Sequence, residues 1–348
     1  MEYQLMYKDE IVAEFNQTAM TAQHEYVVIK KTRLPIGMQN GMTLKNWLKQ
    51  RRADKSRVSV RKLLATLKMN FQEGEYVSQF RKPTDFWWVR KTGSNDIFNS
   101  QIEDLHLLAL GLEAVVFKNP KNYEVANIGS YDKGWKAGRL VKSGNKNELF
   151  SEMLYAKISK KYLPTAKYQL EQINNKTFIT TPNFLNIATD GYLVLADEWT
   201  GTGVEEVFED WFIKFQKMLT PEEITGLKIM HFLDVVLNNF DRHCQNFGFI
   251  YFEAKPRILA PNFDFNLAII GYNGLENLGA NEINVKTYFD LFSDIPELVK
   301  AVPNNEWLAK EIALISKDLG LCSQQYLIVA SWIINRWERL IGGFSEDT

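Results

Sequence analysis

The chain opens with three short apolar segments. Residues 3–7 and 11–15 roughly alternate between apolar and polar side chains, as a half-buried strand does, and residues 26–29 form a more continuous apolar run. Helical spacing of apolar positions follows over residues 43–52 and 58–69. The pattern therefore predicts a β-rich beginning followed by two helices.

A predicted domain boundary lies in the middle of the chain. A helical pattern covers residues 101–112, and the polar residues 118–122, Lys-Asn-Pro-Lys-Asn, have a composition typical of a loop. We place the boundary near Asn119. Beyond it the pattern predicts one helix among four strands, with the helix at 148–161 and the strands at 139–141, 168–172, 177–184 and 191–199. These segments are expected to form one sheet with an inserted helix.

Helical spacing dominates the remainder of the chain. Helices are expected at 221–239, 283–292, 307–318 and 324–340, and two strands at 247–252 and 257–259. We find no internal repeat and no low-complexity tract. The sequence thus predicts an α+β fold in three parts, a β-rich and helical N-terminal domain at 1–118, a strand-rich part at 119–200 and a mainly helical part at 201–348.

Composition narrows the class of protein. The 348 residues carry 41 Lys and Arg against 42 Asp and Glu, a formal net charge of −1, which argues against a general polyanion binder. A hydrophobic content of 45% excludes intrinsic disorder. Only two cysteines, Cys244 and Cys322, are present, and we find neither a secretory signal nor an apolar run of the ~18–20 residues that a membrane span needs. We therefore expect a cytoplasmic protein without membrane contact.

One stretch of the chain is strongly basic. Lysines and arginines are concentrated at Lys49, Arg51, Arg52, Lys55, Arg57, Arg61 and Lys62. Clustered cations of this kind can neutralise the phosphates of a nucleic acid or bind an acidic partner. A charge run is more often a solvated helix face, which is the interpretation we favour, so any DNA contact is expected to be weak or indirect.

The strongest chemical pattern follows a well-marked helix. Residues 220–223, Thr-Pro-Glu-Glu, combine an N-cap, a proline at the first helical position and a capping-box glutamate. The helix ends in two asparagines, and residues 241–246 then read Asp-Arg-His-Cys-Gln-Asn before an apolar strand. A second carboxylate, Asp264, stands in Pro-Asn-Phe-Asp-Phe at 261–265. The chain therefore has Asp241, then Asn246 five positions later, then a strand and another aspartate.

This spacing suits phosphoryl transfer. The reaction needs one carboxylate to orient or deprotonate the attacking hydroxyl, and hard oxygen ligands for the Mg²⁺ that neutralises the phosphates. Asp241 is the candidate for the first task, and Asn246 and Asp264 are the candidates for the second. Taken singly, each of the three is more often an ordinary cap, turn or loop residue, and only their joint spacing favours a site.

Upstream residues supply candidates for nucleotide binding. Lys142 ends a predicted strand and Glu152 lies ten residues later in a predicted helix, the arrangement with which kinases hold the α- and β-phosphates. Lys136 and Glu148 lie close by, so the identity of the ion pair stays open at this point. Residues 127–135 form a glycine-containing turn that could cover phosphates, although they contain no GxGxxG.

A hinge to the adenine base is expected where the strand at 177–184 ends. Pro182, Asn183 and Phe184 stand there, and their backbone would meet the base.

These segments resemble the HipA-like serine/threonine kinases of bacterial toxin–antitoxin modules and their stand-alone relatives. Residues 239–248 are similar to that family's Asn-x-Asp-x-His-x-x-Asn-Phe catalytic segment, and residues 261–265 to its metal-binding segment. The resemblance extends to residues 140–144 and 148–152, and the chain's opening also looks like the N-terminal part of some such proteins. It covers nearly the whole chain, with the catalytic segment as its specific part.

The resemblance implies a role for each matching residue. Asp241 becomes the catalytic base, and His243 supports its loop. The metal ligands are Asn246 and Asp264, and Lys142 becomes the ATP lysine with Glu152 as its partner. In one departure from the family, Asn266 stands where related sequences often place glycine.

The same resemblance implies a fold and partners. It implies a two-lobed, protein-kinase-like fold, in which residues 119–200 are the ATP-binding lobe and residues 201–348 the helical catalytic lobe. The implied cofactors are ATP and Mg²⁺, the implied substrate is a protein, and a separate antitoxin-type partner is implied by the family alone. Two other interpretations stay open, a small-molecule phosphotransferase, and an inactive kinase-like module that binds a partner or DNA through the basic stretch.

Overall fold

The computed structural model describes most of the chain. The described residues are 1–16, 26–51, 80–98, 103–104, 123–124, 133–136, 138–173, 175–185, 190–202, 206–271, 273–278 and 283–342. The predicted helix at 58–69, the basic stretch beyond Arg51, the predicted boundary near Asn119 and most of the glycine-containing turn lie outside these residues. The division of the chain at 118 and 200 therefore stays a prediction.

The N-terminal residues form an antiparallel sheet. Its strands are β1 (Tyr3–Tyr7), β2 (Glu10–Phe15), β3 (Tyr26–Val28) and β4 (Trp87–Lys91), in the order β3-β2-β1-β4. The three strands predicted from the sequence are confirmed, whereas β4 was not predicted. Short helices follow, η2 (Lys31–Arg33), α1 (Ile36–Gln39) and α2 (Leu44–Lys49). The β-rich beginning is therefore real, and α2 is shorter than the predicted helix at 43–52.

A second antiparallel sheet carries the upstream candidate residues. It consists of β7 (Lys133–Lys136), β8 (Arg139–Lys142), β9 (Gln169–Ile173) and β10 (Lys176–Pro182), in the order β7-β8-β10-β9. Helix α5 (Lys146–Ser159) follows β8, and the side chain of Asn145 caps its first turn. Nearly every side chain from Glu148 to Ser159 is buried, so α5 is an interior helix.

The strand predicted at 191–199 does not join that sheet. Its first half is β11 (Tyr192–Leu195), which pairs with β12 (Gly248–Tyr251), and β12 in turn pairs with β13 (Ile258–Leu259). Its second half is a helical turn, α6 (Ala196–Trp199), so the prediction was wrong there. The backbone N–H of Ala196 donates to Phe247 O, and the carbonyl of Ala196 accepts from Thr200 N, so Ala196 ends the pairing with the distant strand and begins the helical turn.

The predicted helix at 101–112 is also contradicted at its described residues. Glu103–Asp104 is a strand, β5, which pairs in parallel with β6 (Tyr123–Glu124). A helical apolar period cannot reveal a pairing partner about twenty residues away.

Helices make up most of the remainder, as predicted. They are α7 (Phe208–Phe215), α8 (Pro221–Val236), α9 (Lys286–Leu291), α10 (Asn305–Asp318), α11 (Ser323–Tyr326) and α12 (Ile328–Ile341), with 3₁₀ turns at Gln216–Met218, Gly274–Asn277 and Glu297–Lys300. Helix α7 was not predicted, and α8 ends before the predicted helix at 221–239 does. The predicted helix at 324–340 is two helices, α11 and α12. No helix among the described residues is long and apolar enough to cross a membrane.

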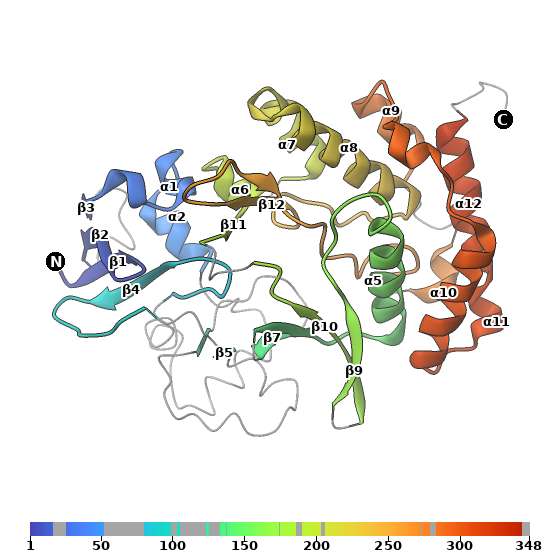
Figure 1. Ribbon diagram of the computed structural model, residues 1–348, viewed down its shortest axis with the longest axis horizontal. Coiled ribbons are helices and arrows are strands. Elements are labelled where there is room, and N and C mark those ends of the chain that lie inside the picture. Colours follow the sequence, from blue (N-terminus) through green and yellow to red (C-terminus); the bar gives the residue numbers. More distant parts are fainter. Residues whose placement is uncertain are drawn as a thin grey trace.

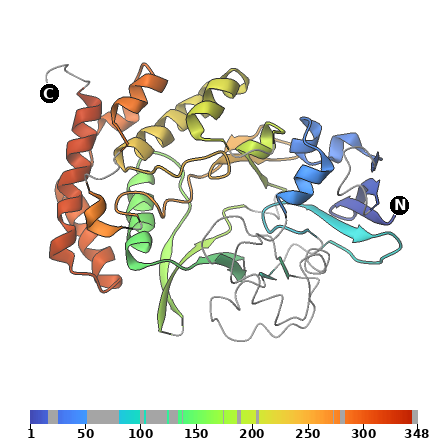
Figure 2. The ribbon, with the colours of Figure 1, turned by 180° about the vertical axis from the view of Figure 1, so that it is seen from behind.

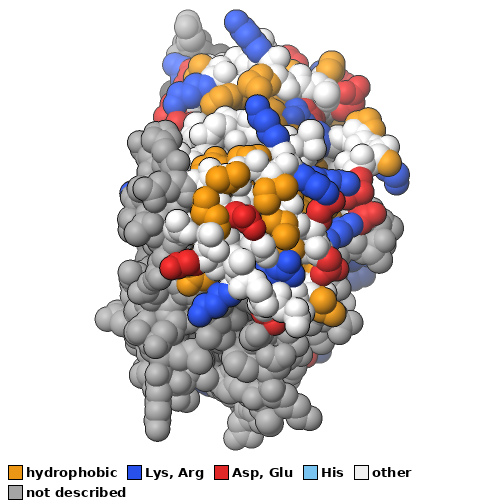
Figure 3. All heavy atoms as spheres, turned by 90° about the vertical axis from the view of Figure 1, so that its left-hand side faces the viewer, with side chains coloured by type: hydrophobic (Ala, Val, Ile, Leu, Met, Phe, Trp, Pro, Cys, Tyr) orange, Lys and Arg blue, Asp and Glu red, His pale blue; other side chains and the backbone are white. Residues whose placement is uncertain are grey.

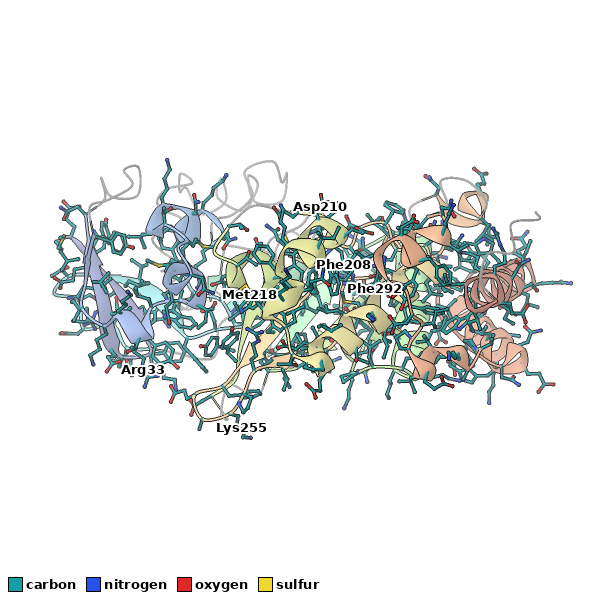
Figure 4. The ribbon with its side chains drawn as sticks, turned by 90° about the horizontal axis from the view of Figure 1, so that it is seen from above. Arg33, Phe208, Asp210, Met218, Lys255 and Phe292 are labelled. Atoms are coloured by element: carbon teal, nitrogen blue, oxygen red, sulfur yellow. The ribbon has the colours of Figure 1, made fainter. Side chains whose placement is uncertain are left out.

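The elements form a mixed α/β molecule (Figures 1 and 2). The sheet of β1 to β4 lies at one end and the helices α10 to α12 at the other, while the second sheet, α5 and α8 lie between them. Aromatic side chains join the helices, since Phe208 of α7 stacks on His231 of α8 with ring centroids 4.9 Å apart, and the centroid of His231 lies 5.7 Å from that of Phe292. Phe208 and Phe292 are labelled in Figure 4. Apolar side chains gather on the face at the N-terminal end, with charged side chains around them (Figure 3).

Candidate active site

A pocket of about 210 Å³ contains most of the candidate residues. This volume is several times the roughly 30 Å³ of one water molecule, so the pocket suits a small organic ligand. Its lining includes the candidates Lys142, Pro182, Asn183, Phe184, Asp241, His243, Asn246 and Asp264, together with Lys82, Pro83, Thr84, Lys133, Trp135, Leu140, Ala166, Tyr168, Thr181, Leu193, Leu195, Gln245, Phe263 and Asn266. Residues more than a hundred positions apart in the sequence thus share one cavity.

A buried group of three charges lies on one side of the pocket. Lys142, the last residue of β8, donates from Nζ to both carboxylate oxygens of Glu152 on α5, at 2.7 and 2.9 Å. The same Nζ donates to Asp264 Oδ1 at 2.7 Å. The side chains of Lys142 and Glu152 are only 5% and 2% exposed, and that of Asp264 is 20% exposed. The strand and the interior helix thus hold a buried ammonium against two carboxylates.

This grouping fixes the charge states. Burial alone lowers the pKa of Lys142, but the carboxylates of Asp264 and Glu152 outweigh it, and the pKa lies above the ordinary lysine value. Burial likewise raises the pKa of Asp264, but the Lys142 ammonium outweighs it, and the pKa lies well below the ordinary aspartate value. At neutral pH, therefore, Lys142 is a cation and Asp264 an anion.

The structure separates the two glutamates that the sequence left as alternatives. Glu148 Oε2 accepts from the backbone N of Asn145 at 2.7 Å, while Asn145 Oδ1 accepts from Glu148 N, which is a capping box. Glu148 therefore stabilises the start of α5, and Glu152, one turn later, is the partner of Lys142. Lys136 lies in β7 opposite Arg139, and its side chain is outside the described part of the structure.

The segment after α8 forms another wall of the pocket. Helix α8 begins with the predicted capping box of Thr220 and Glu223. Beyond its end, Asn238 adopts a left-handed φ of 53°, a conformation that asparagine tolerates, and the chain then turns toward the pocket. Asn246 Nδ2 donates to the backbone O of Asp241 at 2.8 Å and lies 3.0 Å from His243 Nε2. These contacts close the segment into a compact loop that presents Asp241, His243 and Asn246 together.

Arg242 holds this loop and was not recognised from the sequence. Its buried guanidinium forms a two-pronged ion pair with Asp234 of α8, at 2.8 Å from Nε to Oδ2 and 3.0 Å from Nη2 to Oδ1. It also donates to the carbonyls of Asn246 and Phe263, at 2.5 and 3.1 Å, and to Asn262 Oδ1 at 3.1 Å. One arginine therefore ties the 241–246 loop to the 262–264 segment and both to α8.

Asp264 has an unusual backbone. Its φ is +66°, in the left-handed region, and its backbone N donates to Tyr168 Oη at 3.1 Å. Aspartate tolerates this region better than most residues, and such conformations occur often at ligand sites. The next residue, Phe265, stacks on Tyr155 of α5 with centroids 4.1 Å apart, which anchors the segment on the interior helix.

The oxygen groups present fit a magnesium ion shared with phosphates. Among the described residues no cluster of three or more His, Cys, Asp or Glu side chains could enclose a metal. Mg²⁺ is, however, commonly held by one or two protein oxygens together with substrate phosphates and water. Asn246 and Asp264 supply one amide oxygen and one carboxylate at the same pocket. Two such ligands suit a Mg²⁺ ion that phosphates and water also coordinate, and are too few for a site made of protein ligands alone.

Several pocket residues were missed by sequence reasoning. Lys133 of β7 pairs directly with Lys142 across the sheet, so their side chains share one face, where two like charges destabilise each other unless an anion lies between them. Lys82, Pro83 and Thr84, from the N-terminal part, line the pocket as well. Only Lys133 had a local signal, since it lies in the segment 127–135 that was predicted as a glycine-containing turn. The described residues of that segment, 133–135, belong to strand β7 instead, so the prediction was wrong there. Residues 82–84 come from a distant part of the chain.

The predicted hinge residues are held in place at the end of β10. Asn183 N donates to Gly138 O at 2.9 Å, and Asn183 Nδ2 donates to Pro83 O at 2.9 Å. Phe184 stacks against Phe263 with ring centroids 6.0 Å apart. The hinge segment is therefore bound to the second sheet, to the N-terminal part and to the segment that carries Asp264.

Two buried carboxyls lie behind the loop. Asp197 Oδ2 accepts from Gln245 Nε2 of the loop at 3.0 Å and from Gln50 Nε2 at 2.8 Å, and burial raises the pKa of Asp197 to about 6. The neighbouring Glu198 is buried too, and burial raises its pKa to about 7. The loop is therefore bound to Asp197, a buried carboxyl whose pKa lies above its ordinary value.

Glu198→Gln is expected to stabilise the protein at pH 8 and to change little at pH 5. The pKa of Glu198 in the folded protein, about 7, exceeds its value in the unfolded chain. The free energy of unfolding of the wild-type protein is therefore highest at low pH and falls as the pH rises toward 7. A neutral amide avoids burying the charge, so the gain at pH 8 should be roughly 1–3 kcal/mol. Urea unfolding at both pH values measures it.

Glu253→Gln is the control with the opposite sign. The pKa of Glu253 is lowered by the hydrogen bond from Tyr7 and by the charges of Lys8 and Arg33, so its carboxylate stabilises the fold at neutral pH and the variant should lose stability at pH 8. A Glu198→Gln protein that is less stable than wild type at pH 8 would contradict the burial argument.

Comparison with known proteins gives structural likeness only. No protein-family model and no curated protein sequence matches the chain. A solved structure of the Shewanella oneidensis MR-1 toxin–antitoxin system HipA and HipB with operator DNA matches at 11% identity, over 98% of this chain and 97% of that chain, with a TM-score of 0.51. The Helicobacter pylori proinflammatory kinase CtkA matches at 17% identity, over 61% of this chain and 93% of that chain, with a TM-score of 0.44. The first likeness shows a HipA-like fold along nearly the whole chain.

Proposed function

We propose that this protein is an ATP- and Mg²⁺-dependent serine/threonine protein kinase of HipA-like type, with two lobes that meet at the pocket. The observation that carries the proposal is the buried contact of Lys142 with both Glu152 and Asp264, in a pocket that Asp241 and Asn246 also line. An ammonium, a metal-binding carboxylate and a candidate base in one cavity are the parts that phosphoryl transfer needs.

Each part has a role in the proposed reaction. Lys142, oriented by Glu152, holds the α- and β-phosphates of ATP, while Pro182, Asn183 and Phe184 meet the adenine. Asn246 and Asp264 would hold Mg²⁺, which supplies charge neutralisation for the phosphates. Asp241 accepts the proton of the attacking serine or threonine hydroxyl, and His243 supports the loop. Most of the rate enhancement comes from positioning and from fixed charges.

The proposal includes a protein substrate and a separate partner protein. The matched structure contains HipA together with HipB and operator DNA. By analogy we propose that this chain has a separate antitoxin-type partner and that it acts in the cytoplasm. Direct DNA binding through the basic stretch is less favoured, because Arg51, its one described arginine, is buried in an ion pair with Asp85 and also donates to Phe80 O and Trp87 O.

Incubation of the protein with radiolabelled ATP and Mg²⁺ is expected to label protein serine or threonine. The assay is run with ATP alone, which detects autophosphorylation, and with a cell lysate, which detects protein substrates. Mg·ATP should also raise the melting temperature of the protein, because a ligand at about 100 times its Kd adds ~2.7 kcal/mol of stability.

EDTA is the control, since removal of Mg²⁺ should abolish labelling and reduce the thermal shift. Label that appears only in small molecules of the lysate would favour the small-molecule phosphotransferase. A protein without an ATP-dependent thermal shift but with salt-sensitive DNA binding would instead be the inactive module.

A further inference from the structure

Asn266 lies in the turn that follows Asp264 and lines the same pocket. Its side chain is largely enclosed, with 8% of the residue exposed. Its Nδ2 is buried and has no hydrogen-bond partner among the described residues. The pocket therefore has, two positions from its candidate metal ligand, an amide nitrogen that no described residue satisfies.

A buried donor without a partner destabilises the folded protein, because it has lost its bonds to water and gained none in return. Native proteins contain few such groups, and those that persist at a pocket often pair with a ligand. Ser316 of α10 offers a comparison, since its Oγ is also buried and unpaired in the described structure but lies outside the pocket lining. The unpaired group of Asn266 differs in that it borders the space a ligand would fill.

The chemistry of the surrounding residues indicates which group of a ligand the amide nitrogen of Asn266 would bind. Lys142 already donates to two carboxylates, and Asn266 lines the same pocket. A neutral donor at this place can bind an anionic oxygen without adding another full charge. Phosphate oxygens are acceptors only, whereas a base or a ribose offers both donors and acceptors. The position next to Asp264 thus favours the phosphate end of a nucleotide.

We propose that Asn266 is a phosphate-binding residue of this pocket, whose carboxamide donates a hydrogen bond to a phosphate oxygen of the bound nucleotide. The inference rests on the proposed kinase function and adds to it a contact between one side chain of the pocket and the phosphates. The carboxamide reaches the ligand by rotation about its terminal torsion, which is soft for asparagine.

Asn266→Ala is expected to weaken binding of both Mg·ATP and inorganic tripolyphosphate by roughly tenfold, the effect of losing one hydrogen bond to a charged group. Adenosine, which has no phosphate, should bind the variant as it binds wild type. The melting temperature of the ligand-free variant should equal or exceed that of wild type, because an unpaired buried group has been removed. Isothermal titration calorimetry and thermal unfolding measure these quantities without reference to activity.

Two further variants sharpen the test. Asn266→Asp retains the shape but replaces the donor with a charge of the same sign as phosphate, so it should weaken tripolyphosphate binding more than Asn266→Ala does. If residue 266 were a ligand of Mg²⁺ instead, Asn266→Asp would have the opposite effect, because an aspartate would preserve or strengthen metal-dependent binding. Ser316→Ala removes the comparison group outside the pocket and should leave the binding of all three ligands unchanged.

The outcomes separate the two proposals. Equal affinity of wild type and Asn266→Ala for Mg·ATP and tripolyphosphate overturns the role of Asn266 and leaves the kinase assignment intact. Parallel loss of adenosine and tripolyphosphate binding, with a lower melting temperature, would show a structural residue and also overturn it. Wild-type protein that binds neither Mg·ATP nor tripolyphosphate overturns both proposals.

Discussion

Asp241→Asn is expected to abolish phosphoryl transfer while Mg·ATP still binds. A general base contributes roughly 10²–10⁴-fold to a rate, so labelling of protein by radiolabelled ATP should fall by about 10³-fold. Binding should persist because Lys142, Glu152 and Asp264 are unchanged, and because Asn246 contacts the backbone O of residue 241, which the substitution retains. Single-turnover labelling and calorimetry with Mg·ATP measure the two quantities separately.

Asp210→Asn is the matched control, since Asp210 is an exposed aspartate in the first turn of α7 (Figure 4). This variant should label protein as wild type does. Equal transfer by wild type and Asp241→Asn would refute the assignment of the base. Loss of both transfer and binding would instead show that Asp241 organises the pocket, which the retained loop contacts argue against.

The parts of the site that the sequence predicted are those with local signals. The capping box of Thr220 and Glu223 sets the start of α8, as predicted. Residues 241–246 are contiguous and lie in one loop, whereas the roles assigned to them stay predictions. The start of α5 carried a local signal of the same kind, Asn145 with Glu148 three residues later. Had it been recognised, it would have identified Glu148 as a cap and left Glu152 for the ion pair.

The parts that escaped prediction depend on contacts between distant segments. Asp234 looked like one polar position in the long helix α8, and nothing near it in sequence indicates that Arg242 bonds it. Thr84 reaches the pocket because its carbonyl accepts from Leu193 N, 109 residues later, at 2.9 Å. The strand β11 ends where its pairing with β12 ends, and Asp197 of the following turn bonds Gln245 of the loop, 48 residues later. Apolar periodicity contains no information about such pairings.

The site is built from two kinds of residue. The residues proposed to do chemistry are recognisable in the sequence, because their spacing is set by reaction geometry within short segments. The residues that hold those segments against one another are ordinary buried polar groups, and only the structure identifies them. Variants of the second kind should therefore reduce stability and activity together, whereas a variant at Asp241, which is outside the buried charge group, should reduce activity alone.

Arg242→Met is expected to destabilise the protein by roughly 3–5 kcal/mol and to abolish transfer. The substitution leaves Asp234 buried without its counter-charge and removes the donors to the carbonyls of Asn246 and Phe263. Because folded domains are stable by only about 5–15 kcal/mol, this loss is a large fraction of the total. Arg242→Lys should also be strongly destabilising, since one ammonium cannot replace a planar fork with several fixed donors. Urea unfolding monitored by circular dichroism measures both.

A double-mutant cycle tests whether the pair with Asp234 is the cause. Asp234→Asn removes the unpaired charge, so in its presence Arg242→Met should cost less, with a coupling free energy of roughly 1–3 kcal/mol. Lys228→Met is the control, because Lys228 pairs with an aspartate, Asp294, that is 61% exposed, and an ion pair of that kind contributes about 0–1 kcal/mol. An Arg242→Met protein as stable as Lys228→Met would contradict the role of Arg242. The predicted difference follows from burial, since the same type of contact is weak in water and strong where neither charge can be solvated.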